Sequence, residues 1–181
     1  DLSKVLSTDK VSFFQLRLKK YSLRSKILIG KKVKRICKKY RVKFLVNDDP
    51  FLAKKLNADG CHLGQKDTSI IETKKLIGNK IIGITCHNSI KLAKSAIKGK
   101  ASYIAFGAFY STKTKATKYK ATTKILNKAK KLTKIPLVAI GGINNNNYKK
   151  LLLNNANLLA ISSYVWSNKK FKPLEAIENL K

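Results

Sequence analysis

The amino-acid sequence predicts an α/β protein, specifically a (β/α)8 TIM barrel that here lacks its first β-strand. Short apolar runs alternate along the whole chain with amphipathic, lysine-rich segments, which is typical of βα units. The runs are apolar on both faces, which indicates buried parallel strands covered by helices. Polar residues follow the end of each run, and in a barrel all these loops meet at one mouth. An open sheet uses only the loops near its switch point, so the barrel is favoured.

Seven apolar runs are the expected strands, at residues 11–17, 42–48, 59–64, 80–85, 102–107, 135–142 and 158–163. A barrel needs eight strands, so we expect the missing one to precede Asp1 and the chain to be N-terminally incomplete. The first ten residues are then expected to form the end of the first barrel helix. A seven-stranded barrel would expose an apolar gap, so we expect this chain to fold poorly by itself.

Helices are expected between the strands, at residues 21–41, 49–57, 69–77, 89–99, 122–133, 145–154 and 173–180. Three of them begin at residues that favour helix N-termini: Asp49 before Pro50, Thr68 or Ser69, and Asn88 or Ser89. The helices and strands together leave no linker or low-complexity break.

The chain has 181 residues and 44% hydrophobic content, which suffices for one core, so we expect a single domain over residues 1–181. It has no apolar run long enough to span a membrane and no secretory signal, so we expect a cytoplasmic protein. Cys37, Cys61 and Cys86 are odd in number and lack C-x-x-C spacing. We therefore expect buried, reduced thiols rather than disulfides or a zinc site.

The formal net charge of +31 raises the question of nucleic acid or an anionic membrane as a partner. Arginine, which specific phosphate and base recognition favours, occurs only at Arg17, Arg24, Arg35 and Arg41. The lysines are spread over the chain rather than clustered. We therefore interpret the charge as a lysine-rich solvated surface, and we expect neither a nucleic-acid nor a membrane partner.

Four of the nine acidic residues fall within residues 46–67, which is unexpected in so basic a chain. Asp48 and Asp67 each follow a predicted strand, on neighbouring strands, so a divalent cation can lie between them. Two carboxylates with waters and a phosphate are a usual set of ligands for magnesium. The alternative for each is an N-cap, a role that better suits Asp49, and Asp59 is interpreted as a turn residue.

Several loops carry groups that suit anions. Gln15, Arg17 and Lys19 alternate along an extended segment, so their side chains share one side. Gly141 and Gly142 follow the sixth run and Ser162 and Ser163 follow the seventh, which is where barrels often bind phosphate. The alternatives are a basic strand end for the first group and tight strand-to-helix packing for the glycines.

We expect different roles for the two histidines, His62 and His87. His62 lies inside a predicted strand, and we expect a hydrogen-bonded buried residue rather than a catalyst. His87 follows a strand end after Thr85, where it either reaches the mouth or caps a helix.

In chain order the motifs are QLRLK at 15–19, VNDDP at 46–50, ADGCHLGQKD at 58–67, GITCHN at 83–88, FGAFYSTKTK at 106–115, IPLVAIGGI at 135–143 and ANLLAISS at 156–163. Together they resemble the thiamine phosphate synthase family, within the superfamily shared with thiazole tautomerases. The resemblance runs through nearly the whole chain. No single motif is decisive, but all of them occur in register.

The resemblance implies a magnesium-dependent transferase of thiamine biosynthesis. Such an enzyme joins 4-amino-2-methyl-5-hydroxymethylpyrimidine diphosphate, here the pyrimidine diphosphate, to 4-methyl-5-(2-phosphoethyl)thiazole, here the thiazole phosphate. The products are thiamine phosphate and pyrophosphate. It implies that Asp48 and Asp67 bind Mg²⁺, and that the catalytic residues are Arg17, Lys19, Thr85 and Lys115. The remaining substrate-binding residues are Gln15 and Asn47 for the pyrimidine diphosphate, and Thr112, Thr114, Gly142, Ser162 and Ser163 for the thiazole phosphate. A homodimer is a further expectation.

This chain departs from the family pattern at five positions: Leu18 replaces an acidic residue, Ala108 and Ser111 replace prolines, and Asn157 and Leu158 replace Asp and Gly. Two alternative functions stay open. A thiazole tautomerase would use His87 as an acid or base and would need no metal, against which Asn47, Asp48 and Asp67 speak. A nonenzymatic binder of phosphate ligands or nucleic acid would exploit the net charge instead.

Overall fold

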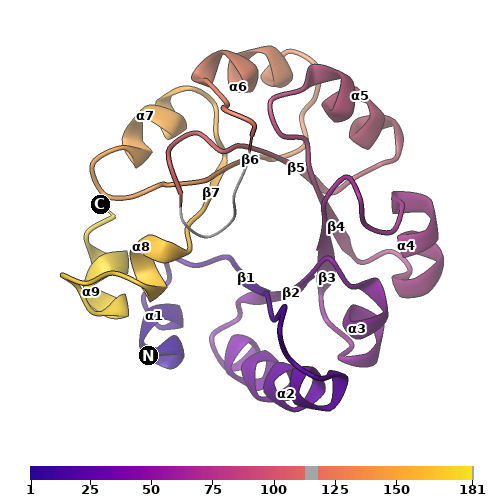
Figure 1. The fold of residues 1–181 in the computed structure, drawn as a ribbon, viewed down its shortest axis with the longest axis vertical. Helices are drawn as coiled ribbons and strands as arrows, with labels where there is room; N and C mark the ends of the chain where they lie inside the picture. The colour runs from indigo at the N-terminus through magenta and orange to yellow at the C-terminus, as the bar shows by residue number, and fades with distance from the viewer. Residues whose placement is uncertain (113–117, 181) are drawn as a thin grey trace. The chain divides into compact units, whose positions relative to one another are not determined.

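The computed structural model describes residues 1–112 and 118–180 and has the predicted alternation of strands and helices (Figure 1). Within these residues there are seven strands, and their order in the sheet follows the chain from β1 to β7. The chain divides into two compact units, Asp1–Gly83 and Ile84–Lys181. The single domain over residues 1–181 stays a prediction.

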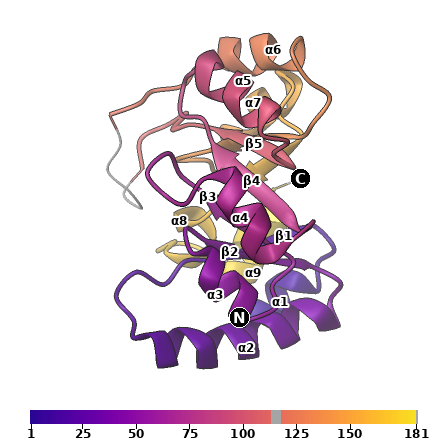
Figure 2. The same cartoon turned by 90° about the vertical axis from the view of Figure 1, so that its right-hand side faces the viewer.

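The first unit contains α1 (Leu2–Leu6), β1 (Phe13–Leu16), α2 (Leu23–Lys39), β2 (Lys43–Asn47), α3 (Pro50–Lys55), β3 (Gly60–Leu63), α4 (Ile70–Ile77) and the start of β4 (Ile81–Thr85). Strand β2 pairs in parallel with both β1 and β3. Its central residues Phe44, Leu45 and Val46 are buried. Helix α2 packs against β2 on the outside of the unit (Figure 2). Strands β2 and β3 are thus buried and covered by helices, as the apolar runs predicted.

The helix starts follow the predicted capping residues. The Asp49 carboxylate accepts a hydrogen bond from Leu52 N–H at 2.9 Å, with Pro50 at the first helical position. Ser69 begins α4 with a capping box, in which Ser69 and Glu72 each bond the backbone of the other. Ser89, rather than Asn88, caps α5 (Ile90–Lys98). Local side-chain chemistry therefore determines where these helices begin.

The second unit contains the end of β4, then α5, β5 (Tyr103–Phe106), α6 (Thr123–Lys130), β6 (Leu137–Ile140), α7 (Tyr148–Leu153), β7 (Leu158–Ala160), α8 (Ser163–Trp166) and α9 (Pro173–Glu178). Strand β6 pairs in parallel with β5 and β7. The core of the second unit includes four completely buried side chains: Ile104, Phe106, Leu126 and Leu137. The short helix α8, which begins at Ser163, was not predicted from the sequence.

Two expectations about single residues have clear outcomes. All three cysteines are buried with free thiols, as expected. Asp59 is more than a turn residue, because its carboxylate accepts a hydrogen bond from Phe44 N–H at 2.8 Å and pairs with Lys43 at 3.9 Å. It therefore links the start of β3 to β2.

Among the described residues, no helix has the length and apolar character that crossing a membrane requires.

Candidate active site

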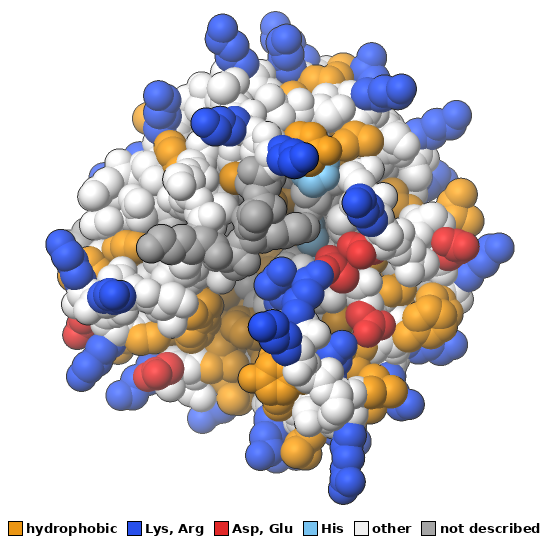
Figure 3. All heavy atoms as spheres, viewed as in Figure 1, with side chains coloured by type: hydrophobic (Ala, Val, Ile, Leu, Met, Phe, Trp, Pro, Cys, Tyr) orange, Lys and Arg blue, Asp and Glu red, His pale blue; other side chains and the backbone are white. Residues whose placement is uncertain are grey.

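The end of β1 presents its predicted anion-binding residues to solvent. Gln15 and Arg17 are exposed and Leu16 between them is buried, which is the alternation expected of an extended segment. Lys19 continues the pattern on the same side and is also exposed. Lysine and arginine side chains are scattered over the face seen in Figure 3, whereas acidic side chains are few there. A carboxylate that holds one of these basic side chains in place therefore marks a candidate site.

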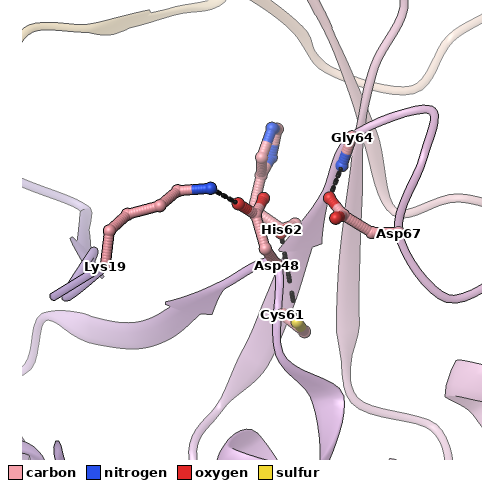
Figure 4. A network of polar contacts seen from close by, with 6 residues as sticks. All are labelled: Lys19, Asp48, Cys61, His62, Gly64 and Asp67. Carbon is pink, nitrogen blue, oxygen red and sulfur yellow. Dashed lines mark hydrogen bonds and ion pairs between the residues drawn. The ribbon is translucent and has the colours of Figure 1, made fainter. Parts of the chain in front are cut away.

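Asp48 is such a carboxylate. It follows directly after β2, in the left-handed backbone region with φ 63°, and its N–H donates to the carbonyl oxygen of His62 at 2.7 Å. This conformation is uncommon for a residue other than glycine and costs free energy, so residues held in it often serve a site. The Lys19 ammonium donates to Asp48 Oδ2 at 2.8 Å (Figure 4).

Asp67 lies beside Asp48, in the loop after β3. Its Oδ2 accepts a hydrogen bond from Gly64 N–H at 2.7 Å, which fixes the side chain (Figure 4). Partial burial raises the pKa of Asp67, and the nearby Asp48 carboxyl raises it further, against the Gly64 hydrogen bond. Burial also raises the pKa of Asp48, but hydrogen bonds from Lys19, Asp67 and Asn47 hold it below its usual value. The two carboxyls therefore interact directly, with their pKa values pushed in opposite directions.

The first unit thus brings together Lys19, Asn47, Asp48 and Asp67, which we call the carboxylate cluster. No group of three or more His, Cys, Asp or Glu side chains suited to a metal occurs among the described residues. A pair of carboxylates differs from such a protein-only cage, because it leaves most coordination positions to water and ligand oxygens. His62 is buried at 7% exposure, as expected for a residue inside a strand.

The end of β4 carries Thr85 and His87 in the second unit. Thr85 is the last residue of the strand and is half-buried. His87 is in the left-handed region with φ 52°, and its carbonyl oxygen accepts a hydrogen bond from Gly107 N–H at 3.0 Å. Its ring stacks on Tyr119, with centroids 4.1 Å apart and an interplanar angle of 19°. Ser89 provides the helix cap, so His87 is not needed for it.

A cavity of about 580 Å³ lies in the second unit, at the ends of β6 and β7. It is lined by Ser111, Thr112, Gly142, Ile143, Asn144, Ser162, Ser163, Tyr164, Ser167, Asn168 and Lys169. We call it the hydroxyl pocket. Four of the predicted thiazole phosphate residues, Thr112, Gly142, Ser162 and Ser163, lie together in it. The fifth predicted thiazole phosphate residue, Thr114, lies outside the described residues, and so does the predicted catalytic residue Lys115.

The backbone at Gly142 has a conformation and a packing that require glycine. Its φ is 67°, and a Cβ there would collide with the carbonyl oxygen of Ser111 and lie 2.8 Å from Tyr110. Gly141, with φ 97°, would collide in the same way with Ala108. Close approach of two loops, rather than flexibility, is therefore what these glycines provide.

Sequence reasoning missed the pocket residues that come after Ser163 and within the asparagine run. Lys169 adds an ammonium to the lining, and Asn144 and Asn168 add amides. A lysine among so many lysines carries no signal in the sequence, and the run of Asn144 to Asn147 is easily taken for a solvated loop. Only the fold shows which of these side chains lie at the pocket.

A comparison with protein families finds that residues 2–165 match the model described as thiamine monophosphate synthase. The chain belongs to the thiamine monophosphate synthase family. Within this family, it is 66% identical over 181 residues to the thiamine-phosphate synthase of Pelagibacter ubique strain HTCC1062, covering 100% of this chain and 87% of that protein. It is 39% identical over 158 residues to the thiamine-phosphate synthase of Nitrosomonas eutropha, covering 87% of this chain and 74% of that protein.

Solved structures of the family show the same fold. Thiamine phosphate pyrophosphorylase from Pyrococcus furiosus superposes with a TM-score of 0.89 at 30% identity, covering 99% of this chain and 85% of that one. The enzyme of the same name from Bacteroides thetaiotaomicron has a TM-score of 0.68 at 18% identity, covering 98% and 86%, and supports the fold alone. The predicted TIM barrel is confirmed, with seven of its strands among the described residues.

Proposed function

We propose that this chain is a transferase that condenses the pyrimidine diphosphate with the thiazole phosphate, giving thiamine phosphate and pyrophosphate. The observation that carries the proposal is the carboxylate cluster, in a chain that belongs to the family. The exposed Lys19 ammonium is held by Asp48, one of two interacting carboxylates. This arrangement suits a diphosphate that carries a bound metal ion. The hydroxyl pocket in the second unit supplies groups for a second anion.

We assign the pyrimidine diphosphate to the residues at the ends of β1 and β2. Arg17 and Lys19 provide positive charge, and Gln15 and Asn47 provide amide hydrogen bonds. By resemblance to the family, Lys115 belongs to this set, and Thr85, the last residue of β4, contributes a hydroxyl for the pyrophosphate. Arginine at position 17 suits this role because its fork binds two phosphate oxygens at once.

The residues present fit a magnesium ion. Asp48 and Asp67 offer oxygen ligands from neighbouring loops. Burial raises the pKa of Asp67 and the nearby Asp48 carboxyl raises it further, and a divalent cation would relieve the unfavourable interaction between the two carboxyls. Magnesium keeps several waters and is commonly held by one or two carboxylates with substrate phosphates, so two carboxylates suffice. When bound, the ion would neutralise negative charge on the diphosphate. Asp48 and Asp67 would hold it.

We assign the thiazole phosphate to the hydroxyl pocket. Thr112, Ser162 and Ser163 supply hydroxyl donors, and Gly142, which has no Cβ, lets the loop that carries Ser111 and Thr112 come close. Lys169, which also lines the pocket, provides a positive charge that suits a phosphate. Thr114 belongs to this set by resemblance to the family. The volume of about 580 Å³ is in the range of small-ligand pockets.

The chemistry requires no protein nucleophile. The bond between the pyrimidine methylene carbon and the diphosphate oxygen breaks, and its electron pair leaves with pyrophosphate. The lone pair of the thiazole nitrogen then forms the new carbon–nitrogen bond. By resemblance to the family, Arg17, Lys19 and Lys115 stabilise the charge that develops on the leaving group, and the residues of the hydroxyl pocket hold the attacking thiazole. The electron-rich aminopyrimidine stabilises its own transient cation.

The direct test is formation of thiamine phosphate from both substrates in the presence of Mg²⁺, with each substrate omitted in turn. Product that requires both substrates supports the transferase. Isomerisation of a thiazole carboxylate phosphate without metal, lost in His87→Ala, would support the tautomerase instead. Binding of duplex DNA without turnover, weakened steeply by salt, would support a polyanion binder. A homodimer, a cytoplasmic location and the lack of nucleic-acid or membrane partners stay predictions.

A further inference from the structure

The side chain of Asn147 bridges two points of the loop between β6 and α7. Its Oδ1 accepts a hydrogen bond from Asn144 N–H at 2.9 Å, and its Nδ2 donates to the Gly142 carbonyl oxygen at 3.0 Å. One half-buried amide therefore uses both its acceptor and its donor inside one short loop. Gly142 and Asn144, the two residues that it joins, both line the hydroxyl pocket.

The same residue also fixes the neighbouring loop after β5. Tyr110 donates its hydroxyl hydrogen to the Asn147 carbonyl oxygen at 3.1 Å, and Tyr110 N–H donates to the Gly141 carbonyl oxygen at 3.0 Å. Tyr110 directly precedes Ser111 and Thr112, which line the pocket from that side. The close approach of Ser111 to Gly142 shows how tightly these two loops pack.

Asn147 is not one of the described residues that line the pocket, so any influence on a ligand passes through the groups that it holds. We propose that Asn147 is a positioning residue for the phosphate end of the thiazole substrate. It sets the spacing between Gly142, Asn144 and the loop of Ser111. The inference rests on the proposed function, because it takes the hydroxyl pocket as the phosphate site.

The key variant is Asn147→Ser. Asn147 makes no side-chain cap hydrogen bond to α7, so serine removes no cap, but its short side chain cannot bridge Gly142 and Asn144. We expect the KM for thiazole phosphate to rise about tenfold, as for the loss of one or two hydrogen bonds. We expect kcat and the KM for the pyrimidine diphosphate to stay within about twofold, because their groups are untouched.

Two comparisons separate positioning from general loosening of the fold. The unphosphorylated thiazole alcohol should bind the variant and the wild type equally, because the effect concerns the phosphate alone. Asn154→Ala is the matched control at the other end of α7, where Asn154 Nδ2 donates to the Lys150 carbonyl oxygen at 2.8 Å. It should leave the KM for thiazole phosphate unchanged.

Tyr110→Phe tests the second link without removing the ring. It deletes the hydroxyl bond to Asn147, and we expect a smaller rise in the same KM. The double variant with Asn147→Ser should show less than the sum of the two effects, because both act through one bridged loop pair. Strictly additive effects would contradict the shared arrangement.

Calorimetric titration of thiazole phosphate into the wild type and Asn147→Ser gives a readout that does not need turnover. Tight binding to the wild type and about tenfold weaker binding to the variant supports the inference. Equal binding to both overturns the role of Asn147 and leaves the proposed function intact. No binding to the folded wild type overturns the pocket assignment, and the inference falls with it.

Discussion

Lys19 Nζ lies 2.8 Å from Asp48 Oδ2, and this ion pair joins the segment after β1 to the residue after β2. The Lys19 side chain is 53% exposed and that of Asp48 is 26% exposed, so the pair is open to water and to a ligand. An exposed pair of this kind contributes little to folding. Its proposed role is instead to hold the Lys19 ammonium beside the Asp48–Asp67 pair.

Replacement of Lys19 should therefore impair catalysis more than stability. We expect Lys19→Met to lower kcat/KM for the pyrimidine diphosphate by about tenfold to a hundredfold, since a hydrogen bond to a charged group contributes about 1.5–3 kcal/mol. Lys54→Met, which removes an exposed lysine of α3, is the matched control and should retain activity. Equal kinetics for the two variants would exclude Lys19 from the diphosphate site. Steady-state assays and thermal melts make the comparison.

A pair of glycines separates backbone strain from steric collision. Gly142 and Gly78 have φ values of 67° and 69°, but a Cβ at Gly78 meets nothing within 4 Å, whereas one at Gly142 meets Ser111 and Tyr110. Gly78→Ala should cost stability through backbone strain and leave the KM for thiazole phosphate unchanged. Gly142→Ala should cost stability and also raise that KM at least about tenfold, because the pocket loops must move apart. Similar KM values for the two variants would contradict the packing argument.

The capping box of α4 predicts a measurable stability difference. Ser69→Ala removes the hydroxyl that accepts the Glu72 N–H, and we expect a loss of about 1 kcal/mol in the free energy of unfolding. Ser95→Ala, at an exposed position inside α5, should instead leave stability equal or raise it slightly, because alanine favours helix interiors. Denaturant titrations of both variants test this. A loss of the same size at Ser95 would show that the cap is not responsible.

Burial of the thiols predicts a pH effect of definite sign. Burial raises the pKa of Cys37 to about 12 from 9.0, with a further contribution from Asp59. Between these values the unfolded chain loses the thiol proton and the folded chain keeps it, so this contribution to stability is lost as pH rises. In Cys37→Ala the decline of unfolding free energy with pH should be shallower, by about 1.4 kcal/mol per pH unit. Identical slopes for the wild type and Cys37→Ala would contradict the assignment of this pH dependence to Cys37.

Most of the fold and part of the site could be predicted from the sequence. The apolar runs marked the seven strands of the described residues, and the signal is continuous where a strand is buried on both faces, as β3 and β5 are. Asp49 marked one helix start, and two others were each narrowed to two residues, of which Ser69 and Ser89 are the caps, because a cap acts over only three residues. Whether Asp48 and Asp67 bind magnesium stays a prediction, although the structure places them together as their positions suggested.

The remaining features depend on how loops fold against one another. The bridge made by Asn147 requires a particular course of the backbone after Gly142, and four successive asparagines give no signal of which one makes it. The hydrogen bond of Asp59 to Phe44 links two strands and has no local pattern. Lys169 lines a pocket only because α8 follows β7 directly. Such contacts appear only once the strands are in register.

The most direct test of the central claim is the release of pyrophosphate from the pyrimidine diphosphate, measured with and without thiazole phosphate and Mg²⁺, for wild type, Asp67→Asn and Asp9→Asn. Asp9→Asn makes the same charge change at an exposed residue whose φ of 57° asparagine tolerates. We predict release that needs both substrates and Mg²⁺, is retained in Asp9→Asn and is nearly abolished in Asp67→Asn. Release that is equal in the two variants, or none from folded wild-type protein, would contradict the account.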